Sequence, residues 1–375
     1  MKKVLGSIAI AAGLTIGASV VHADMHPGIQ GLNDLLIQKG IITKEEVDAQ
    51  AKKHSFNITG YVQFQGKINQ NEDRSPNDGF TVRRAKLSAF GYAYEHINFK
   101  LEANFVGVSG SPSSLSLDDA YIEDNHLPYL VGRAGQFKVP FSLEELTSDT
   151  EILSIERSEV VKQIAPGRDQ GISFSGNIPG IPVSYGIGAF NGQKTPAGTT
   201  YGIGANEDAA KNKANDNDQL LYAARITAKP LEWISIGISG LTSKDGGVGT
   251  TLAVDRNAYE VELQIKSPKR GCSLQGEYLR QWLKNSSDAT TTSDGFYVQA
   301  GHYIMPKHLE AVIKYEEYDS DKDTANKDDI RWTTVGLNFY IYGNDAKLMA
   351  NYIFKDEKQQ DYNNNTFLTQ LQLRF

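Results

Sequence analysis

From residue 56 to the end of the printed sequence, most segments alternate between apolar and polar residues. In 56–69 the apolar side chains fall mainly on even positions, and in 367–375 they fall mainly on odd positions. The apolar members of these two segments are Phe56, Ile58, Val62, Phe64 and Ile68, and then Phe367, Leu371, Leu373 and Phe375. A period of two gives a β-strand one apolar and one polar face, whereas a helix needs a period of 3.6. The alternation therefore predicts that this part of the chain consists of β-strands.

The same alternation recurs in further segments of about ten residues. The count reaches about sixteen, an even number that is typical of an all-β fold, the transmembrane antiparallel β-barrel. The connections alternate between short turns, expected on the periplasmic side, and longer polar loops, expected on the extracellular side. The predicted short turns are Pro179-Gly180, Lys229-Pro230, Ser267-Pro268, Met305-Pro306 and Gly343-Asn344, and the predicted loops are 69–79, 192–218, 241–257, 284–295, 319–329 and 356–366.

The strand that ends at Phe375 supports closure of the barrel. An exposed edge strand invites aggregation, whereas the last strand of a closed barrel pairs with the first. In bacterial outer-membrane barrels, an aromatic final residue is a hallmark of the strand that the barrel assembly machinery reads. We therefore expect Phe375 to be the barrel-assembly signal and 56–375 to be the barrel domain, located in the bacterial cell outer membrane and in contact with its lipid.

The first 55 residues differ from the rest. Residues 1–23 resemble a signal peptide, with Lys2 and Lys3 before an apolar stretch and a small-residue cleavage site before Asp24. No later run of 18 apolar residues occurs, and a membrane protein without apolar helices must span as a closed barrel. Helical spacing of apolar residues within 24–55 predicts a short helical N-terminal periplasmic extension, or alternatively a mobile tail with nascent helix.

Composition excludes several classes of function. Acidic residues (45) outnumber basic ones (38), and loss of Lys2 and Lys3 would take the net charge from −7 to −9, which argues against a nucleic-acid partner. The single cysteine, Cys272, excludes an internal disulfide, and no CxxCH, GxSxG or HExxH string occurs. We therefore expect no catalytic residue, no metal site and no cofactor, which means that the protein is not an enzyme.

One connection, residues 139–169, is too long for an ordinary barrel turn. It carries periodic apolar residues, among them Phe141, Ile152, Ile155 and Val160. Loops of this length in compact folds usually have a function. We expect the loop to fold inward and to narrow the lumen, and the alternative is a lid or clasp on the extracellular side.

Basic side chains of the early strands and of this loop form the candidate functional site. The polar half of each strand must face the lumen, because a charge on the lipid face costs about 2–4 kcal/mol near the bilayer midplane. Positive charges along an aqueous passage concentrate anions there. The predicted anion-guiding residues, called the basic arc below, are Arg84, Lys86, Lys100, Arg133, Lys138, Arg157, Lys162 and Arg168.

Acidic residues could offset this arc. The predicted opposing acidic residues are Glu102, Asp119, Glu123 and Glu144. The later strands add Glu260, Glu262, Glu277, Glu310 and Glu316, which predict an acidic wall on the other side of the lumen. Three interpretations remain open for the arc: a net anion-guiding constriction, a mixed and weakly selective constriction, or a structural network of salt bridges.

Several strings, in order from about residue 56 to the end, resemble the phosphate-selective porin O and P family of Gram-negative bacteria. They are Arg83-Arg84-Ala85-Lys86-Leu87, Asp119-Ala120-Tyr121, Gly135-Gln136-Phe137-Lys138-Val139-Pro140-Phe141 with Glu144, Ile155-Glu156-Arg157-Ser158, Arg168-Asp169-Gln170-Gly171, Phe190-Asn191-Gly192 and Leu371-Gln372-Leu373-Arg374-Phe375. The resemblance implies a sixteen-stranded, homotrimeric anion porin with a basic ladder in its pore. The acidic excess of this chain departs from the basic lumen of the family's phosphate-dedicated members.

Together these features predict an outer-membrane porin that passes small hydrophilic solutes by diffusion, with anions such as phosphate preferred. Two other hypotheses belong to different classes. The barrel could be a scaffold that sheathes a multihaem electron-transfer partner, or an adhesion or structural protein that acts through its loops. Conductance of the purified protein discriminates the porin from both.

Overall fold

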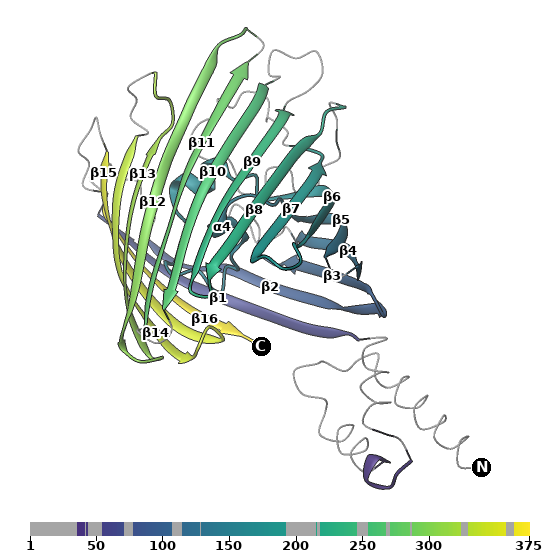
Figure 1. The fold of residues 1–375 in the computed structure, drawn as a ribbon. Coiled ribbons are helices and arrows are strands. Elements are labelled where there is room, and N and C mark those ends of the chain that lie inside the picture. The colour runs from purple at the N-terminus through teal and green to yellow at the C-terminus, as the bar shows by residue number, and fades with distance from the viewer. Residues whose placement is uncertain are drawn as a thin grey trace.

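The computed structural model describes sixteen strands that close into one antiparallel barrel (Figure 1). The description covers residues 36–41, 43, 55–70, 78–106, 115–127, 129–192, 215, 218–245, 254–267, 271–285, 287–323, 329–357 and 364–375. The fold class that the alternation predicted is confirmed. The strands are β1 (Asn57–Asn69), β2 (Gly79–Tyr94), β3 (Ile97–Asn104), β4 (Ser116–Leu127), β5 (Leu130–Lys138), β6 (Arg168–Asn177), β7 (Val183–Phe190), β8 (Leu221–Leu231), β9 (Ile234–Asp245), β10 (Val254–Ser267), β11 (Cys272–Asn285), β12 (Thr290–Met305), β13 (Leu309–Asp319), β14 (Ile330–Tyr342), β15 (Ala346–Glu357) and β16 (Thr366–Arg374).

The barrel closes where β1 pairs with β16. Val62 lies opposite Leu373 and Phe64 opposite Leu371, so the apolar faces of the two strands are in register. Just beyond β16, the backbone N–H of Phe375 donates to the oxygen of Gly60, and the N–H of Gly60 donates back, each at 2.9 Å. A side chain at Gly60 would collide with the Phe375 ring, because an added Cβ would lie 2.9 Å from its Cζ.

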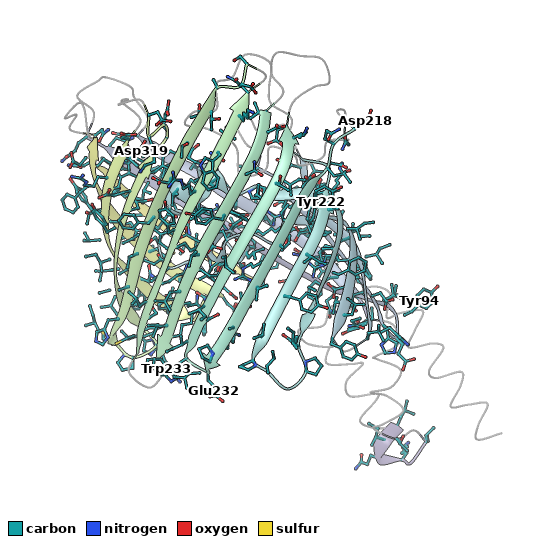
Figure 2. All side chains as sticks on the ribbon, turned by 45° about the horizontal axis from the view of Figure 1, so that its top comes forward. Tyr94, Asp218, Tyr222, Glu232, Trp233 and Asp319 are labelled. Atoms are coloured by element: carbon teal, nitrogen blue, oxygen red, sulfur yellow. The ribbon has the colours of Figure 1, made fainter. Side chains whose placement is uncertain are left out.

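The alternation separates an apolar outside from a polar inside. On β14, Val335, Leu337 and Phe339 are exposed, whereas Thr334 and Asn338 are buried toward the lumen. Exposed aromatic residues lie near both ends of the wall, as Tyr94 and Trp233 at one end and Tyr222 near the other illustrate (Figure 2). An apolar outer band between two aromatic girdles is the surface expected of a barrel in lipid.

The connections follow from antiparallel pairing, which puts the start of β1 and the end of β16 at one end of the barrel, called the terminal end below. The turns β2–β3, β8–β9 and β14–β15 lie at this end. Three predicted connections are wrong in detail. The expected loop 241–257 is only 246–253, because β9 extends to Asp245 and β10 begins at Val254. Strand β8 continues through Pro230, so that its turn is at Glu232 and Trp233, and the expected loop 284–295 is only 286–289 because β11 and β12 are longer. No helix in the described part of the chain is long and apolar enough to cross a membrane.

The predicted signal peptide, 1–23, lies outside the described residues, as does most of the predicted extension, 24–55. Within the extension, residues 36–38 form a short helical stretch, and Ile41 closes it with a hydrogen bond to the oxygen of Leu36. The domain boundaries expected at the N-terminus therefore stay predictions.

The long connection between β5 and β6 folds into the lumen. It comprises residues 139–167, because Arg168 already belongs to β6, and it contains α4 (Leu143–Leu146) and α5 (Glu159–Ile164). Val160, Val161 and Ile164 of α5 are completely buried. They join an apolar cluster with lumen-facing side chains of the wall, including Leu221, Leu241, Leu279 and Tyr297. Each such burial stabilises the folded state by about 1.5–3 kcal/mol, which explains why the loop turns inward. The alternative of an extracellular lid is wrong.

Candidate functional site

The inward loop, 139–167, makes hydrogen bonds with the barrel wall along most of its length. Near its start, Ser142 donates its hydroxyl to Glu277 on β11 at 2.6 Å. Farther along, Asn338 on β14 donates to the oxygen of Leu153, and the N–H of Ile155 donates to Asn351 on β15. On the other side of the barrel, Gln63 on β1 donates to the oxygen of Asp149 at 3.0 Å. The loop therefore crosses the lumen and forms a constriction.

Asp149 is the centre of the contacts between the loop and the basic arc. Its carboxylate lies 2.9 Å from Lys86 Nζ and 3.3 Å from Arg84 Nε, and 2.6 Å from Arg157 Nη1 on the loop itself. The Tyr61 hydroxyl donates a hydrogen bond of 2.9 Å to the same carboxylate. Burial alone would raise the pKa of the Asp149 carboxyl, but the neighbouring cations hold that pKa well below its ordinary value. Asp149 therefore stays charged, and it neutralises the middle of the arc.

A second group of ion pairs continues along the wall from β2 to β6. Arg168 Nε lies 2.7 Å from Asp119, which also lies 2.6 Å from Lys100 Nζ. Lys100 is in addition 3.0 Å from Glu102, and Lys86 is 2.7 Å from Asp118. Since Lys86 also binds Asp149, the two groups form one continuous network.

All eight residues of the basic arc have carboxylate partners. Lys138 lies 3.7 Å from Glu145, and Glu145 also lies 3.7 Å from Arg157, so both belong to the network. Beyond the network, Arg133 donates to Glu123 at 2.9 Å and Lys162 lies 3.4 Å from Glu159. The arc is thus gathered on β2–β6 and the inward loop, as the alternation placed it. Its charges are paired, which favours the mixed constriction or the salt-bridge network over free positive charges.

The acidic residues expected to offset the basic arc lie beside it or on the loop, and three of them are paired with its cations. Glu102, Asp119 and Glu123 lie on β3 and β4 and bind the arc directly, because neighbouring strands place their lumen-facing side chains side by side. Glu144 lies on the loop, where it accepts hydrogen bonds from the N–H and the hydroxyl of Ser158 at 2.8 and 2.7 Å. Burial raises the pKa of the Glu144 carboxyl.

The acidic wall of the later strands lies where the sequence placed it, on the inner faces of β10, β11 and β13. Glu260, Glu262, Glu277, Glu310 and Glu316 are all buried. Two of them hold the loop: Glu277 accepts the N–H groups of Leu143 and Glu144, and Glu316 accepts the N–H of Glu159 at 2.5 Å. Glu310 accepts the Tyr340 hydroxyl instead.

Arg83 is a lumen-facing cation that the alternation missed. A strict period of two would turn Arg83 toward lipid, because Arg84 faces inward. A β-bulge interrupts the β1–β2 pairing here, where Gln63 lies opposite Arg84 and Phe64 opposite Val82. Arg83 therefore also points inward, and it binds Glu156 of the loop through two hydrogen bonds of 3.0 and 3.1 Å. Burial would raise the pKa of the Glu156 carboxyl, but Arg83 and Lys162 hold it well below its ordinary value.

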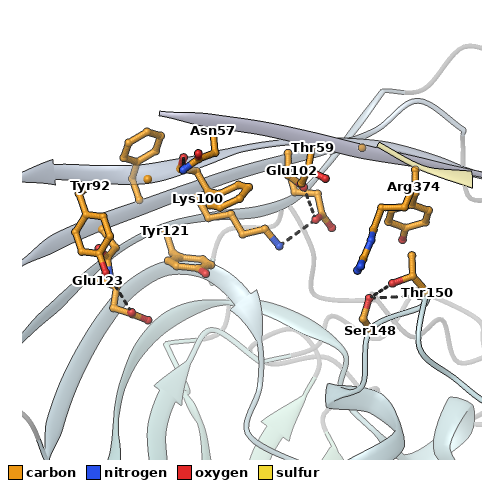
Figure 3. Close-up of a pocket in the computed structure, with 17 residues that line it drawn as sticks. Asn57, Thr59, Tyr92, Lys100, Glu102, Tyr121, Glu123, Ser148, Thr150 and Arg374 are labelled. Carbon is orange, nitrogen blue, oxygen red and sulfur yellow. Dashed lines mark hydrogen bonds and ion pairs between the residues drawn. The ribbon is translucent and has the colours of Figure 1, made fainter. Parts of the chain in front are cut away.

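The loop separates two cavities. The lower cavity, about 500 Å³, lies at the terminal end, and Ser148 and Thr150 of the loop line it (Figure 3). Lys100 and Arg374 extend toward it from different sides, and Glu102 and Glu123 also line it. Two cations and two carboxylates make the lower cavity neutral overall.

The upper cavity, about 230 Å³, lies on the other side of the loop and is rich in cations. Its charged lining consists of Lys67, Arg157, Lys162, Lys314 and Lys355 and of Glu156, Glu159 and Glu316. Five cations against three carboxylates leave an excess of two positive charges. Lys67 has no ion pair within the described residues, and Lys355 Nζ lies 4.7 Å from the centroid of the Trp332 ring. This positive cavity is next to the constriction, on the side away from the chain termini.

A comparison with known families matches residues 56–233 and 242–375 to the family described as "Phosphate-selective porin O and P". These residues cover most of the chain and all of the barrel except 234–241, which belong to β9. The chain belongs to this family. The resemblance drawn from the sequence strings is therefore confirmed, and both the family and the fold are those of channel proteins rather than of enzymes.

Several known proteins resemble this porin at low sequence identity. A protein of Aquifex aeolicus (strain VF5), described as uncharacterized, is 26% identical over 91% of this chain and 92% of its own length. The anion-selective porin from Comamonas acidovorans has a TM-score of 0.61 at 15% identity and covers 85% of this chain and 98% of its own. The outer membrane channel DcaP of Acinetobacter baumannii has a TM-score of 0.60 at 13% identity over 86% and 97%. The trimer form of OmpT, an outer membrane protein of Vibrio cholerae, has a TM-score of 0.57 at 14% identity over 86% and 99%.

Proposed function

We propose that this porin is a passive diffusion channel of a bacterial outer membrane that passes small hydrophilic solutes and prefers small anions. The observation that carries the preference is the upper cavity, whose lining has two more cations than carboxylates. Between walls of low dielectric constant, an excess of fixed positive charge concentrates anions at the mouth of a passage. The family description and the anion-selective porin of Comamonas acidovorans support the same direction.

The location and assembly that we propose rest on the barrel surface and on the relatives. The apolar outer band fits lipid, and the matched structures include outer-membrane proteins. The trimer form of the Vibrio cholerae protein supports a homotrimer. With the terminal end toward the periplasm, the upper cavity would open to the extracellular side. Phe375, whose backbone and ring join β16 to β1, is the residue that we propose as the assembly signal.

The constriction explains why the preference should be moderate. The basic arc is neutralised by its carboxylates, so the ion-pair network sets the size and rigidity of the passage. The net positive charge lies above it, in the upper cavity, whose cations include Lys67 and Lys355. An anion would therefore be attracted to the upper cavity and then pass a nearly neutral constriction.

Planar-bilayer recordings test this function. Purified protein should form open channels whose reversal potential in a KCl gradient indicates anion preference, and the preference should be stronger in dilute salt. The double variant Lys67→Gln/Lys355→Gln should reduce the preference. Lys229→Gln, an exposed lysine at the terminal end of β8, should leave it unchanged. Correctly folded protein that gives silent bilayers would contradict the channel and favour the scaffold barrel, and cation preference in the wild type would contradict the selectivity.

A further inference from the structure

Three buried carboxylates meet on the inner wall where the inward loop begins. Glu260 and Glu262 lie on β10, and Glu277 lies directly opposite Glu262 on β11. One carboxylate oxygen from each of the three residues lies within 4.8 Å of the other two. The strands β9, β10 and β11 are adjacent in the wall, and α4 of the loop lies inside the barrel (Figure 1).

This carboxylate triad carries more negative charge than its neighbours compensate. Like charges directly opposite each other on adjacent strands are destabilising, and burial increases the cost. Within the described part of the chain, the cation paired with the triad is Arg225, which binds Glu262 through contacts of 3.2 and 2.5 Å. Three carboxylates and one guanidinium leave two negative charges, which equals the charge that one divalent cation would neutralise.

An orphaned oxygen gives independent support for a ligand at the triad. Glu260 is completely buried. Its Oε2 accepts the hydroxyl of Ser239 at 2.6 Å, but its Oε1 has no hydrogen-bond partner. A buried polar atom without a partner costs about 1–3 kcal/mol, more when it is charged. The structure thus leaves a carboxylate oxygen of the triad available to a bound group.

The other two carboxylates are held in fixed positions. A Cβ at Gly237, opposite Glu262 on β9, would lie 2.6 Å from Glu262 Oε1, so the glycine leaves room for this carboxylate. Glu277 accepts the Ser142 hydroxyl, two backbone N–H groups of α4 and the Tyr297 hydroxyl at 2.5 Å. Each Glu277 oxygen already accepts two of these bonds, so a cation bound to Glu277 would take the place of the Tyr297 hydroxyl on Oε1.

We propose that Glu260, Glu262 and Glu277 bind a hard divalent cation of the Ca²⁺ class. Such ions take carboxylate, hydroxyl and water oxygens, and Ca²⁺ tolerates irregular geometry where Mg²⁺ requires a near-ideal octahedron. Because Glu277 also holds the first residues of α4, the bound cation fixes the root of the inward loop to the wall. The site is independent of the solute that passes the channel.

Terbium luminescence tests the site without a conductance measurement. Tb³⁺ substitutes for Ca²⁺, and the Tyr297 ring beside Glu277 can sensitise its emission. Wild-type protein in detergent at pH 7.5 should give saturable Tb³⁺ emission that Ca²⁺ displaces. Glu260→Gln should weaken binding by at least about tenfold. Glu310→Gln removes a buried carboxylate of the same wall outside the triad, and it should leave binding unchanged.

The alternative occupant of the triad is a proton shared among the carboxylates. No saturable, Ca²⁺-displaceable emission from folded wild type would favour the proton and overturn the proposal. Equal loss of binding in Glu260→Gln and Glu310→Gln, or no loss in Glu260→Gln, would also overturn it. Should Glu260→Gln fail to fold, Gly237→Ala serves instead, because its Cβ would displace the Glu262 carboxylate and should weaken Tb³⁺ binding.

Discussion

Replacing Asp149 with asparagine removes one negative charge from the centre of the constriction while keeping the shape of the side chain. In the wild type, this carboxylate lies within 3.3 Å of Arg84, Lys86 and Arg157. The network that contains it has six cations (these three with Lys100, Lys138 and Arg168) and five carboxylates (Glu102, Asp118, Asp119, Glu145 and Asp149). The substitution therefore raises the net charge of the network from +1 to +2 and leaves three cations with one partner fewer.

The size of the effect follows from the distances. A mobile anion about 4 Å from one of these cations gains about 4 kcal/mol at an effective dielectric constant of about 20. Lumenal water and salt screen most of this gain. If about 1.4 kcal/mol remains, the ratio of anion to cation permeability rises about tenfold. Loss of the buried charge also costs about 3–5 kcal/mol of local stability. The loop near Ser148 should therefore become looser, and because the loop narrows the passage, the single-channel conductance should increase.

The assay is the reversal potential of single channels in a KCl gradient, recorded with the single-channel conductance. We expect Asp149→Asn to shift the reversal potential toward anion selectivity, more in dilute salt than in concentrated salt. The matched control is Asp288→Asn, which makes the same chemical change in the exposed pair with Lys284. Heat-modifiable gel mobility verifies folding. An unchanged reversal potential in folded Asp149→Asn channels would refute the claim that this ion-pair network controls permeation.

Three further outcomes are expected. Phe375→Ala should lower the amount of folded barrel in membranes more than Leu371→Ala on the same strand, because Phe375 packs on Gly60; equal yields would show that the terminal contact is incidental. Arg83→Gln breaks two bonds to Glu156 and should raise current noise and amide exchange of the loop, and exchange like that of the wild type would argue against this tether. The depressed pKa of Asp149 means that its contribution to stability is present above the ordinary carboxyl pKa of about 4 and is lost only at lower pH. Protection of the loop amides should therefore persist from pH 7 to about pH 4.5, and release of the loop between pH 6 and pH 5 would contradict this assignment.

The amino-acid sequence alone was sufficient to predict the barrel fold. Alternation is a local property, and it determines the strand, its two faces and the direction of each regular side chain. Arg84 and Lys86 could therefore be placed in the lumen before any contact was known. The excess apolar residues of 139–169, such as Val160, likewise indicated that the loop must be buried against something.

The sequence could not give the partners of these charges. Asp149 binds Lys86, 63 residues away, and Glu156 binds Arg83, 73 residues away. Such pairs depend on the path of the loop and on the stagger of neighbouring strands, which no local pattern encodes. The bulge at Arg83 shows the same limit, because one extra residue in a strand reverses the direction that alternation assigns.

The sequence by itself thus determined the closed barrel, its apolar outside and the inward position of the basic arc. Only the tertiary structure decided that the arc is neutralised at the constriction, that positive charge remains in the upper cavity, and that Glu260, Glu262 and Glu277 converge. The physical reason is that strand periodicity acts over two residues. Electrostatic pairing instead acts over a few ångströms of space, between groups that the chain brings together only when the barrel closes around its loop.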